Sequence, residues 1–146
     1  MARDVVAIAR GWIGTPYHHQ ASVKGAGSDC LGLIRGIWRD LNGGCEPEDA
    51  PPYTADWGEI GGQEVLMQGA LRHLRPVPAT APDMPGEVLL FRMRQGAIAK
   101  HLGILARTGP AASFVHAYER HGVIESPLSG PWRARIAARF RFPETN

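Results

Sequence analysis

The hydrophobic pattern of this chain changes its period once, near Pro85-Gly86. Before that point, apolar residues recur every three or four positions in residues 3–14, 30–41 and 64–75, which is the spacing of helices with one buried face. After it, short apolar or alternating runs are separated by glycine and proline turns, and this pattern is typical of strands. Helices followed by antiparallel strands predict an α+β fold.

The predicted strands are residues 87–92, 101–106, 113–118, 123–125 and 136–142. Residues 18–28 show no periodicity and are predicted to form a loop. Four prolines between positions 76 and 85 predict an extended connection. With 146 residues, 44% of them hydrophobic, the chain has enough apolar material for one compact domain over residues 1–146.

Charge and hydropathy exclude some classes of protein. The net charge of +2 is small, and the C-terminal arginines at 133, 135, 139 and 141 are too dilute to predict nucleic-acid binding. No run approaches the roughly 18 apolar residues of a membrane span. The N-terminal residues do not resemble a signal peptide, so we expect synthesis in the bacterial cytoplasm without one.

Residues 43–62 form an irregular acidic segment. They hold five carboxylates, three prolines and five glycines, with no lysine or arginine. A loop of this length in a small domain is more often functional than neutral. We expect it to line a cleft or to bind a partner protein.

Cys30 follows a glycine-rich stretch and begins an amphipathic segment. Ser28 or Asp29 can cap a helix that starts there. Cys30 then lies in the first turn, where free backbone N–H groups and the helix dipole lower the pKa of a thiol. The pattern predicts a cysteine nucleophile. Cys45 has no such context, and two cysteines form no disulfide framework.

Two histidines on consecutive predicted strands are the candidate partners of Cys30. His101 begins one strand, with Gly103 two residues on leaving space beside it, and His116 lies on the next strand across a hairpin near residues 108–110. We predict that His101 takes the thiol proton while His116 bonds the other ring nitrogen.

A zinc site made from Cys30, His101 and His116 is a less favoured hypothesis than a cysteine nucleophile, because the short-spaced ligand pair typical of zinc sites is missing. We therefore expect no metal and no cofactor. Of the other histidines, His73 and His121 are predicted at the surface, and His18 and His19 beside the cleft.

Five separated motifs together resemble the NlpC-type cell-wall cysteine peptidases. They are Gly14-Thr15-Pro16-Tyr17, Asp29-Cys30 with Gly32-Leu33-Ile34, residues 85–91, His101 with Gly103-Ile104, and residues 114–117. The resemblance implies a papain-like fold and cleavage of peptidoglycan stem peptides, commonly between γ-D-glutamate and a diamino acid such as diaminopimelate. By position it makes Cys30 the nucleophile, His101 the base and His116 the orienting residue.

The same resemblance implies roles for two more residues. Tyr17 matches a tyrosine whose hydroxyl lies near the oxyanion position. Asp29 matches a residue that grips the substrate near its free amine, and we expect it to cap the helix as well. Leu31 stands where many members have serine, which leaves the peptide preference open.

A finer pattern is similar to the subgroup encoded in tail-gene clusters of phages and gene transfer agents. It includes His19-Gln20, Trp38, Asp56-Trp57 and Ala99-Lys100. The similarity implies a tail-tip or baseplate component, bound to other tail proteins, that opens the cell wall during DNA delivery and acts in the periplasm of the target cell. Two alternatives stay open: a structural tail subunit with dispensable activity, and a thiol acyltransferase or amidase, because an acyl-enzyme can be resolved by water or by an amine.

Overall fold

A computed structural model describes residues 4–46 and 64–143 of the chain. The helices are α1 (Val5–Arg10), α2 (Cys30–Leu41), α3 (Val65–His73) and α4 (Gly130–Ala134). The strands are β1 (Ser22–Val23), β2 (Gly27–Ser28), β3 (Arg75–Val77), β4 (Val88–Arg92), β5 (Ala99–Arg107), β6 (Ser113–Tyr118), β7 (Gly122–Pro127) and β8 (Ile136–Arg141), and a 3-10 turn, η1 (Gly109–Ala111), joins β5 to β6. This arrangement confirms the predicted α+β class.

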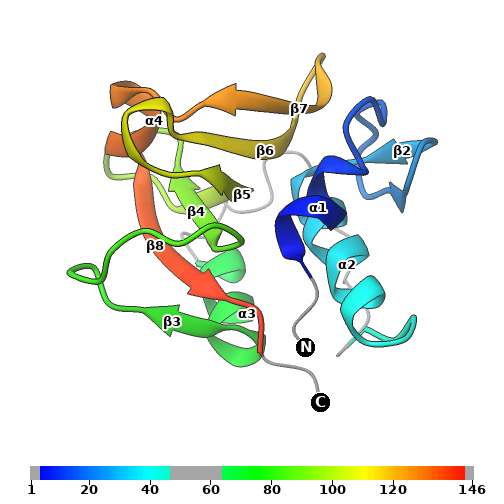
Figure 1. The fold of residues 1–146 in the computed structure, drawn as a ribbon, viewed down its shortest axis with the longest axis horizontal. Coiled ribbons are helices and arrows are strands. Elements are labelled where there is room, and N and C mark those ends of the chain that lie inside the picture. The colour runs from blue at the N-terminus through cyan, green and yellow to red at the C-terminus, as the bar shows by residue number, and fades with distance from the viewer. Residues whose placement is uncertain (1–3, 47–63, 144–146) are drawn as a thin grey trace.

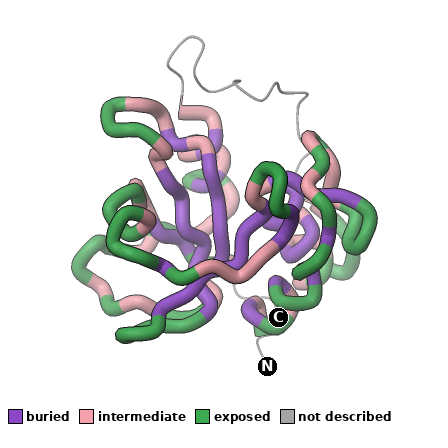
Figure 2. The backbone as a smooth tube through the Cα atoms, turned by 90° about the horizontal axis from the view of Figure 1, so that it is seen from above, coloured by how far each residue is buried: buried purple, intermediate pink, exposed green. Residues whose placement is uncertain are grey.

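The main sheet has the strand order β3-β8-β4-β5-β6-β7, and its neighbouring strands are antiparallel. Helices α1 and α2 lie against one face of it (Figure 1). Leu33 and Ile37 of α2 join Ile104 and Val115 of the sheet in one buried cluster. The middle strands are accordingly buried along most of their length (Figure 2).

The second face of the sheet carries a smaller aromatic cluster. Phe91 and Phe114 are fully buried in it, and Trp132 of α4 packs against them. Side chains alternate between the two faces along a strand. His101 and His116 therefore point to this second face, on the side of the sheet opposite to α2.

Helix α2 begins at Cys30 because Asp29 caps it. The backbone N–H of Gly32 donates to Oδ1 of Asp29 at 2.7 Å, so one of the free donors of the first turn is satisfied. A side chain at Gly32 would place Cβ only 1.9 Å from the carbonyl oxygen of Ala21. The loop that precedes the helix is thus packed directly against its first turn.

Three segments differ from the sequence predictions. Helix α1 ends at Arg10 rather than near residue 14, because turns follow it and bring the Trp12 side chain into the core. The predicted loop over residues 18–28 contains the hairpin of β1 and β2, whose two-residue strands are too short to show an alternating pattern. The predicted extended connection contains β3, which pairs with β8 at the edge of the sheet.

Arg139 on β8 holds the proline-rich segment before β4. Its guanidinium donates to the carbonyl oxygens of Pro78 at 3.0 Å and Ala81 at 2.6 Å, and to the buried carboxylate of Glu87 at 2.9 Å. Arg139 is 9% exposed and Glu87 1%. A buried ion pair that also satisfies several backbone acceptors fixes residues 78–87, which connect β3 to β4.

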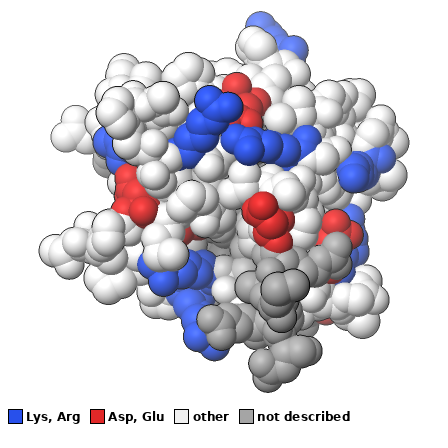
Figure 3. Space-filling model, viewed as in Figure 1, with Lys and Arg blue, Asp and Glu red and all other residues white. Residues whose placement is uncertain are grey.

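Charged side chains of both signs are interspersed on the face seen in Figure 3. Among residues 4–46 and 64–143, no helix is long and apolar enough to span a bilayer.

The close approach at Gly32 gives a first prediction. Gly32→Ala should lower the free energy of unfolding by about 1–3 kcal/mol, because the added methyl group overlaps a backbone carbonyl that side-chain motion cannot relieve. Gly69→Ala is the matched control: it lies inside α3 and meets only Arg72 Nη2 at 3.9 Å, so it should be neutral or stabilise by up to about 1 kcal/mol. Urea denaturation of both variants measures the difference. Equal stability of the two would contradict the packing described here.

Candidate active site

Cys30 lies against the backbone of β5 and contacts the two residues that flank His101, Lys100 and Leu102. Its Sγ is 3.8 Å from the carbonyl oxygen of Lys100, and the backbone N–H of Leu102 forms a hydrogen bond to the sulfur. The residue is half-buried. The first turn of α2 thus brings the thiol to the strand that carries the predicted base.

His101 and His116 are in direct contact. Nε2 of His101 is 2.8 Å from Nδ1 of His116, and the two rings are inclined by 80°. Nε2 of His116 is in turn 2.9 Å from Oγ of Ser126 on β7. The two histidines are 8% and 0% exposed. The structure therefore joins the two histidines as the sequence predicted, and it adds Ser126 as a third member of the chain of contacts.

Aromatic rings surround the histidine pair. The ring of Trp132 lies 5.7 Å from that of His101 and 5.3 Å from that of His116. Phe91 lies 5.7 Å from His101, and Phe114 is 4.1 Å from His116. The space that Gly103 was expected to leave is also filled, since a Cβ there would be 2.8 Å from Phe114. The hydrogen bond between the histidines is consequently shielded from water.

Sequence reasoning missed Ser126 and Trp132. Ser126 sits beyond the end of the strand predicted at 123–125, and Trp132 follows a Gly-Pro pair with no periodic context. Reading the alternation of β7 two residues further would have placed Ser126 on the face of Ile124, the residue paired with His116.

Burial shifts the pKa values of the three central groups away from the charged forms. It lowers the pKa of His101 to about 3, with a further contribution from His116, and that of His116 to about 4. Burial, followed by the charge of Asp29, raises the pKa of Cys30 to about 12, against the lowering effect of backbone N–H groups.

The expectation of a lowered thiol pKa was therefore wrong. The helix N-terminus does supply the expected donors, but burial and the charge of Asp29 outweigh them. In the free protein the thiol of Cys30 and the imidazole of His101 are therefore both neutral at pH 7.

Tyr17 lies close to Cys30. The pKa of its hydroxyl is raised to about 12, mainly by burial and then by the charges of Cys30, Asp29 and Glu119. Tyr17 also forms an isolated bridge with Ser28, two residues before the thiol. The hydroxyl stays protonated at neutral pH and can donate a hydrogen bond next to the sulfur.

Asp29 acts as a structural residue. Its Oδ1 accepts from Gly32 N–H at 2.7 Å and its Oδ2 from Gln20 N–H at 2.8 Å. The residue is only 2% exposed. The cap predicted for Asp29 is present, and its proposed grip on a substrate amine stays a prediction.

Among the remaining candidates, His121 is linked to this centre through Tyr118, which stacks on His116. Cys45 is exposed. His73 contacts the edge of Trp38, whereas His121 stacks on Tyr118. His18 is exposed and His19 half-buried.

Most of the acidic segment, residues 47–62, lies outside the described residues. Its described end, Glu46, pairs with Arg35 at 2.6 Å and Arg39 at 3.1 Å. In the described parts of the chain, no group of three or more histidine, cysteine or acidic side chains is placed to hold a metal ion.

Solved structures show that this fold is that of NlpC/P60 proteins. A lipoprotein-like NLP/P60 family protein from Staphylococcus aureus subsp. aureus Mu50 matches 97% of this chain at 18% identity and a TM-score of 0.61, over 41% of its own length. An NlpC/P60 family protein from Bacillus cereus ATCC 10987 matches 95% at 19% identity and a TM-score of 0.63, over 39% of its length. NlpC1 from Trichomonas vaginalis matches 97% at 18% identity and a TM-score of 0.59, over 44% of its length.

This chain thus spans about two fifths of each of these proteins. No family model matches the sequence, and no curated protein does. At these identities the likeness establishes the shared fold.

The raised thiol pKa predicts slow alkylation of Cys30. In a Cys45→Ala protein, where Cys30 is the remaining thiol, the rate of reaction with iodoacetamide should keep rising above the ordinary thiol pKa of 9.0 toward about 12, because only the thiolate reacts. The rate is measured from pH 6 to pH 11 by mass spectrometry. A plateau reached below pH 8 would instead indicate a thiolate–imidazolium pair in the free protein.

Proposed function

We propose that this protein is a cysteine peptidase that hydrolyses peptidoglycan stem peptides. The observation that carries the proposal is the placement of Cys30 at the start of α2, against the strand of His101, whose Nε2 is bonded to His116. A thiol nucleophile against the strand that carries a base, with that base hydrogen-bonded to an orienting group, is the arrangement that acyl transfer by a thiol requires.

The protonation states define the first step. Because Nε2 of His101 is engaged by His116, Nδ1 is the nitrogen that takes the thiol proton, and the proton of neutral His101 lies on Nε2. His116 then accepts on Nδ1 and directs its own N–H to Oγ of Ser126. The thiol loses its proton to His101 as sulfur attacks the substrate carbonyl, since a thiolate is costly in the free site.

The later steps use the same groups. The tetrahedral oxyanion accepts a hydrogen bond from the Tyr17 hydroxyl, which is protonated at neutral pH. His101 returns its proton to the leaving amine, the C–N bond breaks, and a thioester to Cys30 remains. A water molecule that gives a proton to His101 hydrolyses the thioester and restores the thiol.

The substrate class rests on two supports. The first is the fold, which is shared with NlpC/P60 proteins. The second is the set of sequence motifs that resemble cell-wall peptidases, which favours the bond between γ-D-glutamate and diaminopimelate. Leu31 stands next to the nucleophile where many cell-wall peptidases have serine, so the side-chain preference around that bond is left open.

Cys30→Ala should abolish release of peptides from purified muropeptides while the protein remains folded, because the thiol supplies the attacking atom. Cys45→Ala is the matched control and should retain full activity, since its thiol is exposed and remote. Product analysis by mass spectrometry and circular dichroism of both variants provide the measurements. Hydrolysis that survives Cys30→Ala would refute the mechanism.

The histidines can be ranked in the same assay. His101→Ala removes the base and should lower the rate by about 10²-fold or more. His116→Asn retains an acceptor near the position of Nδ1 and should cost far less. If mass spectrometry shows exchange onto an added amine instead of hydrolysis, the thiol chemistry stands and the reaction is transfer.

The place of action that we propose is the tail tip or baseplate of a phage-like particle, where the enzyme opens the wall of the target cell during DNA delivery. The support is the resemblance of residues 19–20, 38, 56–57 and 99–100 to tail-associated peptidases. Attachment to a particle raises the effective concentration of an enzyme at the wall.

The particle provides the test. Purified particles should contain the protein at the distal end of the tail, and particles that carry Cys30→Ala should assemble normally but deliver DNA poorly. Normal delivery by the mutant particles would favour a structural subunit. Absence of the protein from particles would refute the tail assignment.

A further inference from the structure

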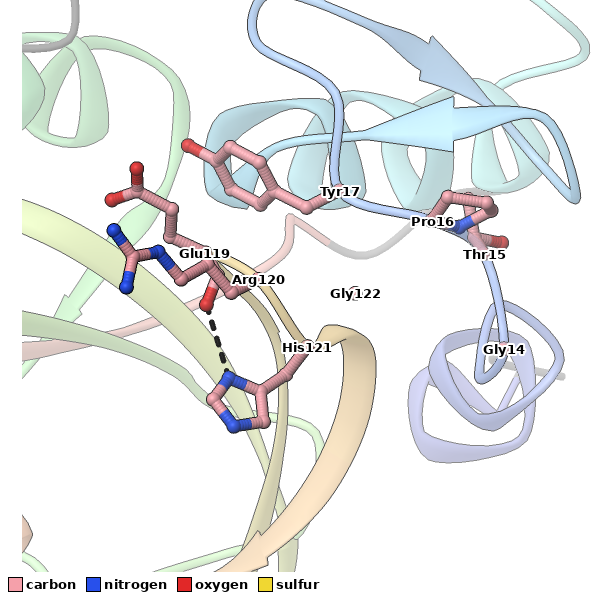
Figure 4. A pocket seen from close by; sticks show the side chains of 8 residues that line it. All are labelled: Gly14, Thr15, Pro16, Tyr17, Glu119, Arg120, His121 and Gly122. Carbon is pink, nitrogen blue, oxygen red and sulfur yellow. Dashed lines mark hydrogen bonds between the residues drawn. The ribbon is translucent and has the colours of Figure 1, made fainter.

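An open hollow of about 480 Å³ lies between two segments that are distant in the sequence. One wall is residues 14–17, which precede the loop that leads to Cys30. The other wall is the β6–β7 turn with Glu119, Arg120 and His121. Figure 4 shows Tyr17, Glu119 and Arg120 extending toward the same side of this hollow. Tyr17 lines the hollow and also forms a backbone bridge with Ser28, two residues before Cys30, so the hollow adjoins the loop that leads to the proposed nucleophile.

The two walls are fixed to each other by the backbone. Val123 N–H donates to the carbonyl oxygen of Thr15 at 2.9 Å, and Gly14 N–H donates to that of Val123 at 3.0 Å. Gly122, with φ of 76°, approaches so closely that a Cβ would be 2.5 Å from the Thr15 oxygen. The turn is also tied to the site by Tyr118, which stacks on His116 and on His121. The backbone of the turn is therefore held in place relative to the histidine pair.

Arg120 occupies a backbone conformation that favours glycine. Its φ of 70° lies in the left-handed region, which costs an ordinary L-residue about 1 kcal/mol. Strained backbone positions cluster at binding and active sites, so this conformation points to a binding role for the Arg120 side chain.

The charges of Glu119 and Arg120 are not paired with other side chains in the described parts of the chain. Over the described residues, 4–46 and 64–143, neither the Arg120 guanidinium nor the Glu119 carboxylate makes a hydrogen bond or an ion pair, whereas many other arginines do so. The hollow thus presents one cation, one anion and the Tyr17 hydroxyl to solvent.

We propose that this hollow is a substrate subsite in which Arg120 binds the free α-carboxylate of a γ-linked acidic residue and Glu119 faces an ammonium group of the neighbouring residue. A γ-linkage leaves the α-carboxylate free, and a guanidinium matches a carboxylate in bidentate geometry. The assignment rests on the proposed function and adds to it the charge state of the substrate.

The test compares two synthetic peptides, L-Ala-γ-D-Glu-meso-diaminopimelate and the same peptide with the glutamate α-carboxylate converted to the amide. Binding to the Cys30→Ala protein is measured by calorimetry, so that no turnover occurs. We expect the acid to bind roughly tenfold or more tightly than the amide, the range of a charged hydrogen-bond pair, and Arg120→Gln to bring this ratio close to one. Arg75→Gln, on β3 at the opposite edge of the sheet, is the matched charge control and should keep the ratio.

A second variant separates binding from folding. Arg120→Gly should lose the preference for the acid while its thermal stability equals or exceeds that of the parent protein, because glycine accepts this φ. Equal binding of the two peptides by the parent protein, no binding of either, or an unchanged ratio in Arg120→Gln would overturn the subsite. Selective binding without cleavage by the wild-type protein would leave the subsite standing and refute the peptidase function.

Discussion

The proposed active arrangement depends on two hydrogen bonds that Asp29 accepts. One comes from Gly32 and begins α2, and the other comes from Gln20 and pulls the preceding loop onto the helix. Because Asp29 is nearly inaccessible to solvent, these charge-assisted bonds are stronger than their exposed equivalents. They determine where the helix starts, and thus which residue faces β5. With the cap in place, that residue is Cys30.

A second constraint comes from the surroundings of the histidine pair. Burial behind Trp132 and Phe114 removes competing water from the bond between His101 and His116, which keeps the base in one orientation. The same burial keeps the thiol protonated and the imidazoles neutral. Burial that fixes the orientation of His101 therefore also prevents a thiolate from forming on Cys30 in the free protein. In the proposed mechanism, charge is therefore created during the reaction, with the substrate carbonyl and Tyr17 present to stabilise it.

The sequence predicted the parts of this architecture that depend on hydrophobic periodicity and on capping and turn residues. Helix α2 was located to the residue because a capping aspartate precedes a long amphipathic run, and the central strands followed from short runs between glycine turns. The contact of His101 with His116 followed from a hairpin. What could not be predicted depends on distant partners: β3 exists because β8 is available to pair with it, and the raised thiol pKa reflects how much protein covers Cys30. Ser126 reaches His116 from a neighbouring strand, which no local pattern reports.

The β6–β7 hairpin carries two kinds of residue at very different depths. His116 is completely enclosed, whereas Glu119 and Arg120, three and four positions further on, are fully at the surface. Glu119 and Arg120 can be replaced without disturbing the core because their side chains are exposed, while the stem is fixed by the sheet and by the ladder of rings from His116 through Tyr118 to His121. A change of charge at these two positions therefore alters the hollow without moving the histidine pair, whereas Gly122 beside them is fixed by its close approach to Thr15.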